Sequence, residues 1–277
     1  MGKNQTDFPK KKELQELLTL ALRLSYKAGK NSLKLFESKL SVESKSDDSP
    51  VTRADREAED IIRTGLEKSL KAHEVIGEEF GSSKKSSEFR WWIDPIDGTL
   101  QFIRGLPFWG SVLGLEFRGE VILGVLHFPA IGLSIDAFKS GGTRMNEKKK
   151  LKVSKASDFS KALFLHSSLR GLEAEEERAL LKTSNLCRDN RGIGDAFGHS
   201  LVIRGIADAL VDFRVNPYDV SAVKICVEEA GGKFSGLSGK STIYERSILC
   251  SNARLHDSFL KSLSSKTLPK LLASEAQ

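Results

Sequence analysis

Residues 91–99 read Trp-Trp-Ile-Asp-Pro-Ile-Asp-Gly-Thr, an apolar run that ends in two acids, a proline, a glycine and a hydroxyl. The run indicates a buried β-strand, but a buried strand rarely ends in two carboxylates, because unpaired buried charge is costly. Direct coordination of a divalent cation offsets that cost. The proline fixes φ and the glycine permits close backbone approach, so Asp94 and Asp97 can face one point beside the amides of Gly98 and Thr99. This arrangement suggests Mg²⁺ with phosphate, although the same residue types also suit an ordinary turn.

Two other segments place acids beside breaks in apolar runs. Residues 75–81 read Val-Ile-Gly-Glu-Glu-Phe-Gly, which predicts a strand end or turn that carries two acids, Glu78 and Glu79, as oxygen ligands. Residues 215–222 read Val-Asn-Pro-Tyr-Asp-Val-Ser-Ala, which places Asp219 after a proline and just before an amphipathic helix. Taken separately, the two segments have ordinary explanations as a solvated surface glutamate pair and a helix N-cap. Their joint occurrence favours a single acidic site.

These segments, followed by Glu-Ala-Gly-Gly at residues 229–232, resemble in type and order the motifs of the inositol monophosphatase superfamily of Mg²⁺-dependent phosphatases. The resemblance runs from about residue 14 to about residue 263. Tyr218 departs from the pattern, because many members carry Trp there. An aromatic ring is retained, so we expect packing beside Asp219 to survive.

Within the superfamily, three segments are more similar to bacterial histidinol-phosphate phosphatases than to the inositol enzymes. These are residues 102–110, 194–199 and 207–212. Ala196 and Phe197 stand where the Gly-Asp-Cys-Tyr-Gly version of the second segment carries Cys and Tyr. The narrower resemblance therefore leaves the exact substrate open.

The resemblance implies a set of metal ligands. Glu78, Asp94 and the Ile96 carbonyl would hold one Mg²⁺, and Asp94, Asp97 and Asp219 would hold a second. A third, weaker site would use Glu78, which gives this acid a catalytic as well as a metal-binding role. Two cations that share Asp94 would lie about 4 Å apart, which is the spacing found in two-metal phosphoryl transfer.

The resemblance also implies how the nucleophile and the phosphate are held. Thr99, with Asp55 behind it, would orient and deprotonate the attacking water, and the amides of Gly98 and Thr99 would bind phosphate. Taken alone, Asp55 is explained by the signature Thr52-x-x-Asp55, in which an acid in the first turn interacts favourably with the helix dipole. Lys45 matches a family lysine near the active site, and a solvated loop lysine is the alternative interpretation.

Substrate recognition depends on the alcohol part of the substrate. We expect Asp195 and Asp212 beside it, together with Asp97 and Lys45. Carboxylates complement the cationic groups of histidinol, and they also accept hydrogen bonds from the hydroxyl groups of inositol. Charge complementarity favours histidinol phosphate.

Composition bounds the class of protein. The chain has 277 residues with 39% hydrophobic content, enough to bury a substantial core as one large domain or two closely packed halves. No apolar run approaches the roughly 18 residues of a spanning helix, and the N-terminus is polar and Lys-rich, so we expect a cytoplasmic protein without a membrane partner. The net charge of +6 is spread over short lysine runs, so we expect no nucleic-acid partner. A small phosphorylated alcohol and a second copy of the chain, in a homodimer, are the expected partners.

Hydrophobic periodicity predicts the elements that carry these motifs. Helical spacing is found over residues 13–36, 52–72, 173–183, 199–206, 220–229 and 255–263. Alternating or short apolar runs predict strands at 110–117, 121–127, 133–138, 163–166, 209–213 and 248–251. This is an α/β (α+β) mixture, and the resemblance implies a layered αβαβα sandwich. Its N-terminal α+β half, residues 1–150, would carry most metal ligands, and its C-terminal α/β half, residues 151–277, would contribute Asp219 and substrate contacts.

Three functions are compatible with these residues. The first is a Mg²⁺-dependent histidinol-phosphate phosphatase, and the second is an inositol monophosphatase or a related sugar-phosphate or nucleotide-phosphate phosphatase. The third, a non-catalytic regulatory or RNA-binding protein on the same fold, is disfavoured, because a silent protein need not retain acids that are costly to bury.

Overall fold

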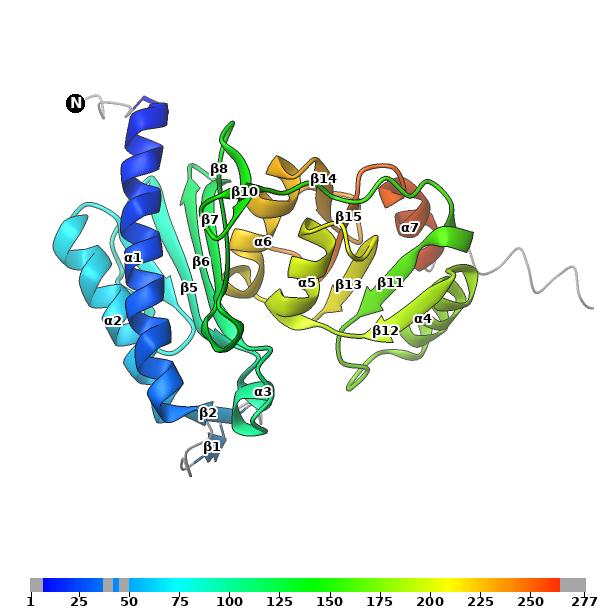
Figure 1. The fold of residues 1–277 in the computed structure, drawn as a ribbon, viewed down its shortest axis with the longest axis horizontal. Coiled ribbons are helices and arrows are strands. Elements are labelled where there is room, and N and C mark those ends of the chain that lie inside the picture. Colours follow the sequence, from blue (N-terminus) through cyan, green and yellow to red (C-terminus); the bar gives the residue numbers. More distant parts are fainter. Residues whose placement is uncertain (1–6, 37–41, 45–49, 265–277) are drawn as a thin grey trace, which may run out of the picture.

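Two long helices pack together at the N-terminal end of the chain (Figure 1). The computed structural model describes residues 7–36, 42–44 and 50–264, and the helices are α1 (Lys11–Leu35) and α2 (Arg53–Ser69). Both are amphipathic, because their buried residues recur at helical spacing, as Leu14, Leu18, Ala21 and Ala28 do in α1. The expected capping signature is confirmed as a reciprocal capping box at the start of α2. Both helices of the first half therefore lie where periodicity predicted them.

The first large sheet has eight strands and lies against α1 and α2. Its strands are β3 (Glu74–Gly77), β4 (Gly81–Ser82), β5 (Phe89–Asp97), β6 (Gly110–Phe117), β7 (Glu120–Phe128), β8 (Leu133–Phe138), β9 (Gly142–Met145) and β10 (Lys149–Lys150). The order is β10-β9-β8-β7-β6-β5-β3-β4, and all neighbours are antiparallel except β3 and β5. A separate two-stranded sheet pairs β1 (Val42–Ser44) with β2 (Pro50–Thr52), and the short helix α3 (Thr99–Ile103) follows β5.

The second large sheet has five strands in the order β12-β11-β13-β15-β14. They are β11 (Leu163–His166), β12 (Asp189–Gly192), β13 (Ala209–Phe213), β14 (Gly232–Gly236) and β15 (Ser247–Asn252). The helices of this half are α4 (Ala174–Leu186), α5 (Asp195–Ile203), α6 (Pro217–Glu229) and α7 (His256–Leu263), and the 3₁₀ turn η2 (Phe159–Lys161) precedes β11. A second 3₁₀ turn, η1 (Pro129–Ile131), joins β7 to β8 in the first sheet. Periodicity did not predict β12 or β14, because β12 is largely exposed and polar and β14 begins at a glycine. The predicted starts of α5 and α6, at residues 199 and 220, were also wrong. Helix α5 begins at Asp195 and α6 at Pro217, before the apolar residues of each helix become regularly spaced.

Successive side chains along the strands of the second sheet point to opposite faces, and each face packs against its own layer of helices. Phe164 and Val211 belong to the cluster formed with α4 and α7, whereas Leu165 and Leu210 belong to the cluster formed with α5 and α6. In Figure 1, α5 and α6 lie between the two large sheets, and α1 with α2 forms the opposite outer layer. The sequence of layers is helix, sheet, helix, sheet, helix, so the predicted αβαβα sandwich is confirmed.

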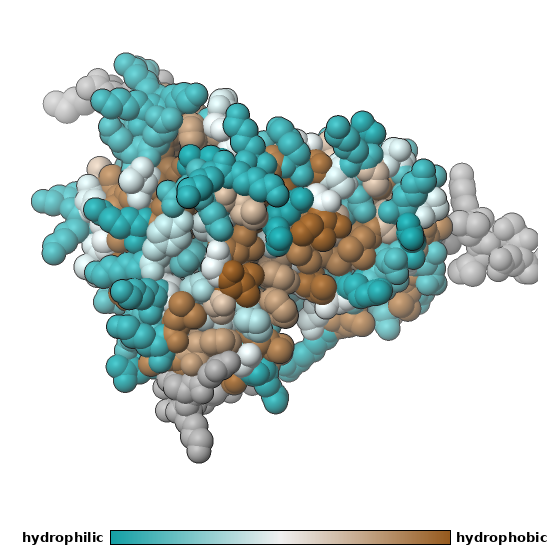
Figure 2. All heavy atoms as spheres, viewed as in Figure 1, coloured by the Kyte–Doolittle hydropathy of each residue, from teal (hydrophilic) through white to brown (hydrophobic). Residues whose placement is uncertain are grey.

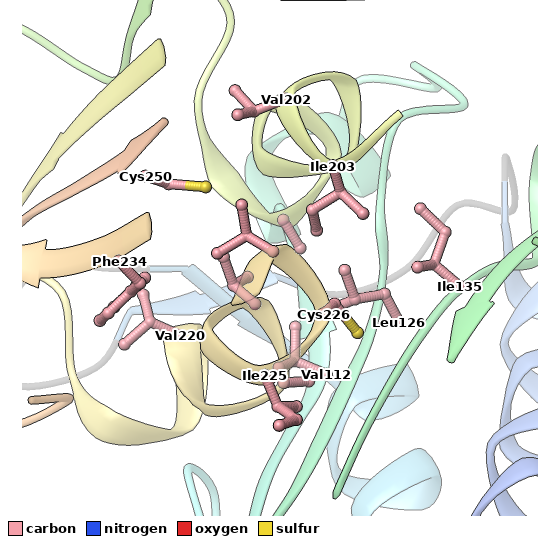
Figure 3. Packing of buried hydrophobic residues seen from close by; sticks show 14 of the residues in the cluster. Val112, Leu126, Ile135, Val202, Ile203, Val220, Ile225, Cys226, Phe234 and Cys250 are labelled. Carbon is pink, nitrogen blue, oxygen red and sulfur yellow. The ribbon is translucent and has the colours of Figure 1, made fainter. Parts of the chain in front are cut away.

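Helix α6 forms the centre of the molecule. Figure 3 shows Ile225 and Cys226 of α6 beside Val112 and Leu126 of the first sheet, while Val220 points toward the second sheet, all within one buried cluster. Because this cluster spans both sheets, it joins the two halves of the chain. The division into halves at residues 150 and 151 stays a prediction.

The outer layer is polar on its exposed side. Figure 2 shows mostly hydrophilic residues over α1 and α2, with hydrophobic residues gathered nearer the middle of this face. Across the described ranges, no helix combines the length and the apolar character needed to cross a membrane.

Candidate active site

A β-bulge at the end of β5 aims two acids at one place. Asp94 pairs with Val112 and Asp97 pairs with Gly110, and the register shifts between them. Pro95 lies inside this interval and has no N–H to donate, so regular pairing cannot continue there. A bulge places an extra residue on one strand and re-aims its side chains. Both acids are buried, with 3% and 9% of their surface exposed.

The start of α2 brings Asp55 to the end of β5. Asp55 Oδ2 accepts hydrogen bonds from Thr52 N at 2.8 Å and from Thr52 Oγ1 at 2.6 Å. Its other oxygen, Oδ1, lies 3.2 Å from Thr99 Oγ1, which also lies 3.1 Å from the Ile96 carbonyl oxygen. Burial raises the pKa of Asp55, and the hydrogen bonds from Thr52 partly oppose this. The sequence-predicted pair of Thr99 and Asp55 is therefore in hydrogen-bond contact.

The start of α6 positions Asp219 in the same way. Asn216 is the N-cap, and its backbone N donates to Asp219 Oδ2 at 2.7 Å, in a reciprocal capping box. Asp219 thus lies inside the first helical turn, whereas the sequence analysis placed it just before the helix or at the N-cap. That placement was wrong because Pro217 occupies the first helical position, where its fixed φ and missing N–H are tolerated.

The clustered acids raise one another's pKa. Desolvation is the largest cause for Asp94, Asp97 and Asp219, and the charges of neighbouring acids, including Glu78, add to it. One oxygen of Asp94, Oδ1, is buried without a hydrogen-bond partner. Among the described residues, no three His, Cys, Asp or Glu side chains are already arranged to hold a metal ion. The donor set nevertheless fits hard divalent cations, because these bind carboxylate oxygens and compensate buried negative charge.

A polar cavity of about 380 Å³ opens beside the acids. It is lined by Glu78, Gly98, Thr99, Leu100, Gln101, Ser167, Ser168, Gly192, Gly194 and Asp195. Gly98 is the N-cap of α3 and has φ of 84°, a left-handed conformation that favours glycine. The cavity thus joins the end of β5 to the N-terminal end of α5.

Asp195 connects the two large sheets. Its carboxylate Oδ2 accepts a hydrogen bond from Gln101 Nε2 of α3, and the next amide, Ala196 N, donates to Asp97 Oδ2 at 2.5 Å. The backbone of Asp195 has φ of 56°, which Asp tolerates better than most residues. Burial, followed by the charge of Asp212, raises the pKa of Asp195 to about 6.

Asp212 lies on β13 and faces a buried histidine. His199 Nε2 of α5 lies 3.3 Å from Asp212 Oδ2, and His199 has 1% of its surface exposed. Asp212 acts on the site electrostatically, because its charge raises the pKa of Asp97, Asp195 and Asp219. It does not line the cavity, and Lys45 lies outside the described residues.

Sequence reasoning missed several residues of the site. Gln101, Ser167, Ser168 and Gly192 line the cavity but belong to segments without a chemical motif. Glu59, which supports the turn that carries Glu78, was also missed. Its spacing of one helical turn from Asp55 was the available signal, because residues four apart share a helix face.

The layered fold and the acidic cavity together define a phosphatase of the class whose motifs the sequence resembles. The chain belongs to the inositol monophosphatase family, whose model matches residues 13–268. A histidinol-phosphatase of Chlorobaculum parvum is 40% identical over 237 residues, 82% of this chain and 88% of that protein. A fructose-1,6-bisphosphatase/inositol-1-monophosphatase of Thermotoga maritima is 32% identical over 76% of this chain and 81% of that protein. The solved structure of a Thermotoga maritima inositol monophosphatase has a TM-score of 0.82 at 28% identity, covering 90% of this chain and 96% of that chain.

Proposed function

We propose that this phosphatase hydrolyses histidinol phosphate in a Mg²⁺-dependent reaction. The observation that carries the reaction class is the cluster of buried Asp94 and Asp97 with half-buried Asp219, in which Asp94 Oδ1 has no hydrogen-bond partner. The Asp195 carboxylate in the adjoining cavity and the histidinol-phosphatase relative support the substrate.

In this proposal Glu78, Asp94 and the Ile96 carbonyl hold one cation, and Asp94, Asp97 and Asp219 hold another. Glu78 also serves a third, weaker position. When bound, the cations supply positive charge that neutralises phosphate and lowers the pKa of the attacking water. Asp219 belongs to the start of α6, and Asp94 and Asp97 belong to the bulged strand β5, so regular elements set the backbone positions of these three acids.

Thr99 and Asp55 handle the proton of the nucleophile. Thr99 Oγ1 can donate to Asp55 Oδ1 at 3.2 Å while its lone pair accepts from water. Asp55 Oδ2 is held by Thr52, so the carboxylate stays oriented while Oδ1 receives the proton. Burial raises the pKa of Asp55, which makes it a better base than an exposed aspartate. The amides of Gly98 and Thr99, at the start of α3, bind phosphate.

Asp195 and Asp212 select the alcohol. Asp195 lines the cavity and Asp212 adds negative charge close to it, so the two acids complement the ammonium and imidazole of histidinol, and Asp97 and Lys45 complete the predicted contacts. The alternative is an inositol phosphate or another sugar or nucleotide phosphate. The Thermotoga maritima relatives support the inositol and sugar phosphates among these. A cytoplasmic location and a homodimer are part of the same proposal.

A substrate panel tests this proposal. Histidinol phosphate, inositol 1-phosphate, fructose 1,6-bisphosphate and adenosine 3′,5′-bisphosphate are assayed with Mg²⁺, then after EDTA, and again after Mg²⁺ is restored. We expect the highest kcat/KM for histidinol phosphate, and loss and recovery of activity with the cation. Faster hydrolysis of inositol 1-phosphate overturns the substrate, and activity after exhaustive chelation overturns the metal dependence.

A further inference from the structure

Glu59 is a fully buried acid that faces the turn after β3. It lies on α2, one turn beyond Asp55, and has 0% of its surface exposed. Glu59 Oε2 accepts from Glu79 N at 2.7 Å, and Oε1 accepts from Phe80 N at 3.2 Å. Both amides immediately follow Glu78 in the chain.

Arg63 extends this contact to the other side of the turn. Its Nη2 lies 2.8 Å and its Nε 3.2 Å from Glu59 Oε1. The same guanidinium donates to the carbonyl oxygens of Gly81 at 2.5 Å and Val75 at 3.3 Å. The pair therefore binds two amides and two carbonyls of residues 75–81.

The backbone around Glu78 is shaped to admit this pair. A Cβ atom on Gly77 would overlap Glu59 Oε1, so glycine leaves room for the carboxylate where it lies. On the opposite side, Glu78 N donates to the carbonyl oxygen of Ile93 at 3.0 Å, next to Asp94 in β5. Glu78 is thus held between α2 and the strand that carries the other acids.

Stability alone is a weak reason for such a pair. Burying two charges is costly, and hydrophobic residues of similar volume often stabilise a fold as well or better. A neighbouring pair on α2, Arg53 and Glu57, lies on the surface with side chains 74% and 34% exposed. The buried pair differs because its partners are the backbone groups of one turn.

We propose that Glu59, oriented by Arg63, is a positioning residue that fixes the turn of Glu78 so that Glu78 and Asp94 bind a divalent cation together. This rests on the proposed function, in which both acids are metal ligands. Substitution of residues that orient metal ligands typically lowers metal affinity by about 10- to 100-fold.

The test compares Glu59→Gln with Glu57→Gln, a matched substitution on the exposed part of the same helix. Mg²⁺ binding to the full chain is measured by calorimetry, and hydrogen exchange of residues 77–81 is measured without Mg²⁺. We expect Glu59→Gln to weaken Mg²⁺ binding by about 10-fold or more and to speed exchange at Glu79 and Phe80, with exchange in β13 unchanged. Glu57→Gln should change neither quantity.

Parental Mg²⁺ affinity in folded Glu59→Gln overturns the positioning role. If Glu59→Gln does not fold, Arg63→Lys replaces it, because lysine keeps the charge but cannot reach several backbone oxygens at once. Parental affinity in Arg63→Lys then overturns the role equally. Asp94→Asn serves as a reference. If it binds Mg²⁺ as tightly as the parent, the proposed metal site itself is wrong. If Asp94→Asn binds Mg²⁺ weakly while Glu59→Gln binds it normally, the metal site stands and only the positioning role of Glu59 is wrong.

Discussion

The two sides of the cavity are built differently. On the phosphate side, local geometry holds Asp55, Asp94 and Asp219: two capping boxes, each spanning four residues, and one bulged strand. On the leaving-group side, the contacts join distant segments, such as Gln101 with Asp195, 94 residues apart. Under the proposed function, the groups assigned to the reaction thus lie in short motifs, whereas those assigned to substrate recognition depend on how the two sheets are brought together.

The largest expected effect is on the phosphate side. Asp94→Asn should lower kcat/KM by on the order of 10³-fold or more, because several kcal/mol of charge stabilisation are lost. The Tm of the metal-free protein should not fall, since a neutral amide removes repulsion among buried acids. Kinetics and thermal unfolding check both statements, and retained activity would show that the acid cluster is not the catalytic centre.

A smaller effect separates two roles within that side. Thr99→Ala should lower kcat on the order of 10²-fold while Mg²⁺ affinity stays near the parental value, because only the proton path through Asp55 is lost. Asp219→Asn should instead weaken Mg²⁺ binding. Calorimetry alongside kcat distinguishes the variants, and near-normal kcat in Thr99→Ala would remove its assigned role.

The leaving-group side should affect selectivity more than chemistry. Asp195→Asn should lower kcat/KM for histidinol phosphate about tenfold, with a smaller change for inositol 1-phosphate, because a charge-assisted contact to a cation is lost. Asn tolerates the left-handed backbone at this position, so the start of α5 should be preserved. Gln101→Ala should act in the same direction but more weakly. Equal losses for both substrates would contradict the division between the two sides.

The smallest effect on activity is expected outside both sides, where a buried histidine makes stability depend on pH. Burial lowers the pKa of His127 to about 4, and an unfolded histidine titrates near 6.5, so stability present above about pH 6.5 is lost as pH falls toward 4. The contribution has an upper bound of about 3 kcal/mol. His127→Phe keeps the ring contact with Tyr26 and should flatten this dependence in urea unfolding, without changing activity at neutral pH. If the free energy of unfolding of His127→Phe depends on pH as steeply as that of the parent, other groups cause the dependence. His256 is one such group, because its pKa is also lowered to about 4.

The sequence by itself indicated the acids of the proposed phosphate side. The acids of residues 91–99 and the signature Thr52-x-x-Asp55 report local backbone geometry, because a proline, a glycine and an N-cap act within a few residues. The strands at 110–117 and 133–138 were predicted with their observed bounds, since alternation over a whole strand is a strong signal. The layered arrangement came from the family resemblance rather than from periodicity.

Only the tertiary structure decided the leaving-group side and the support of Glu78. Gln101 and Asp195 are brought into contact by the packing of the two sheets around α5 and α6. No sequence pattern around either residue predicts this hydrogen bond. Glu59 resembles an ordinary helix acid in sequence, yet it is buried and bound to the turn after β3. Partner choice across long chain separations depends on packing, and a single sequence records which groups are available but not which of them meet.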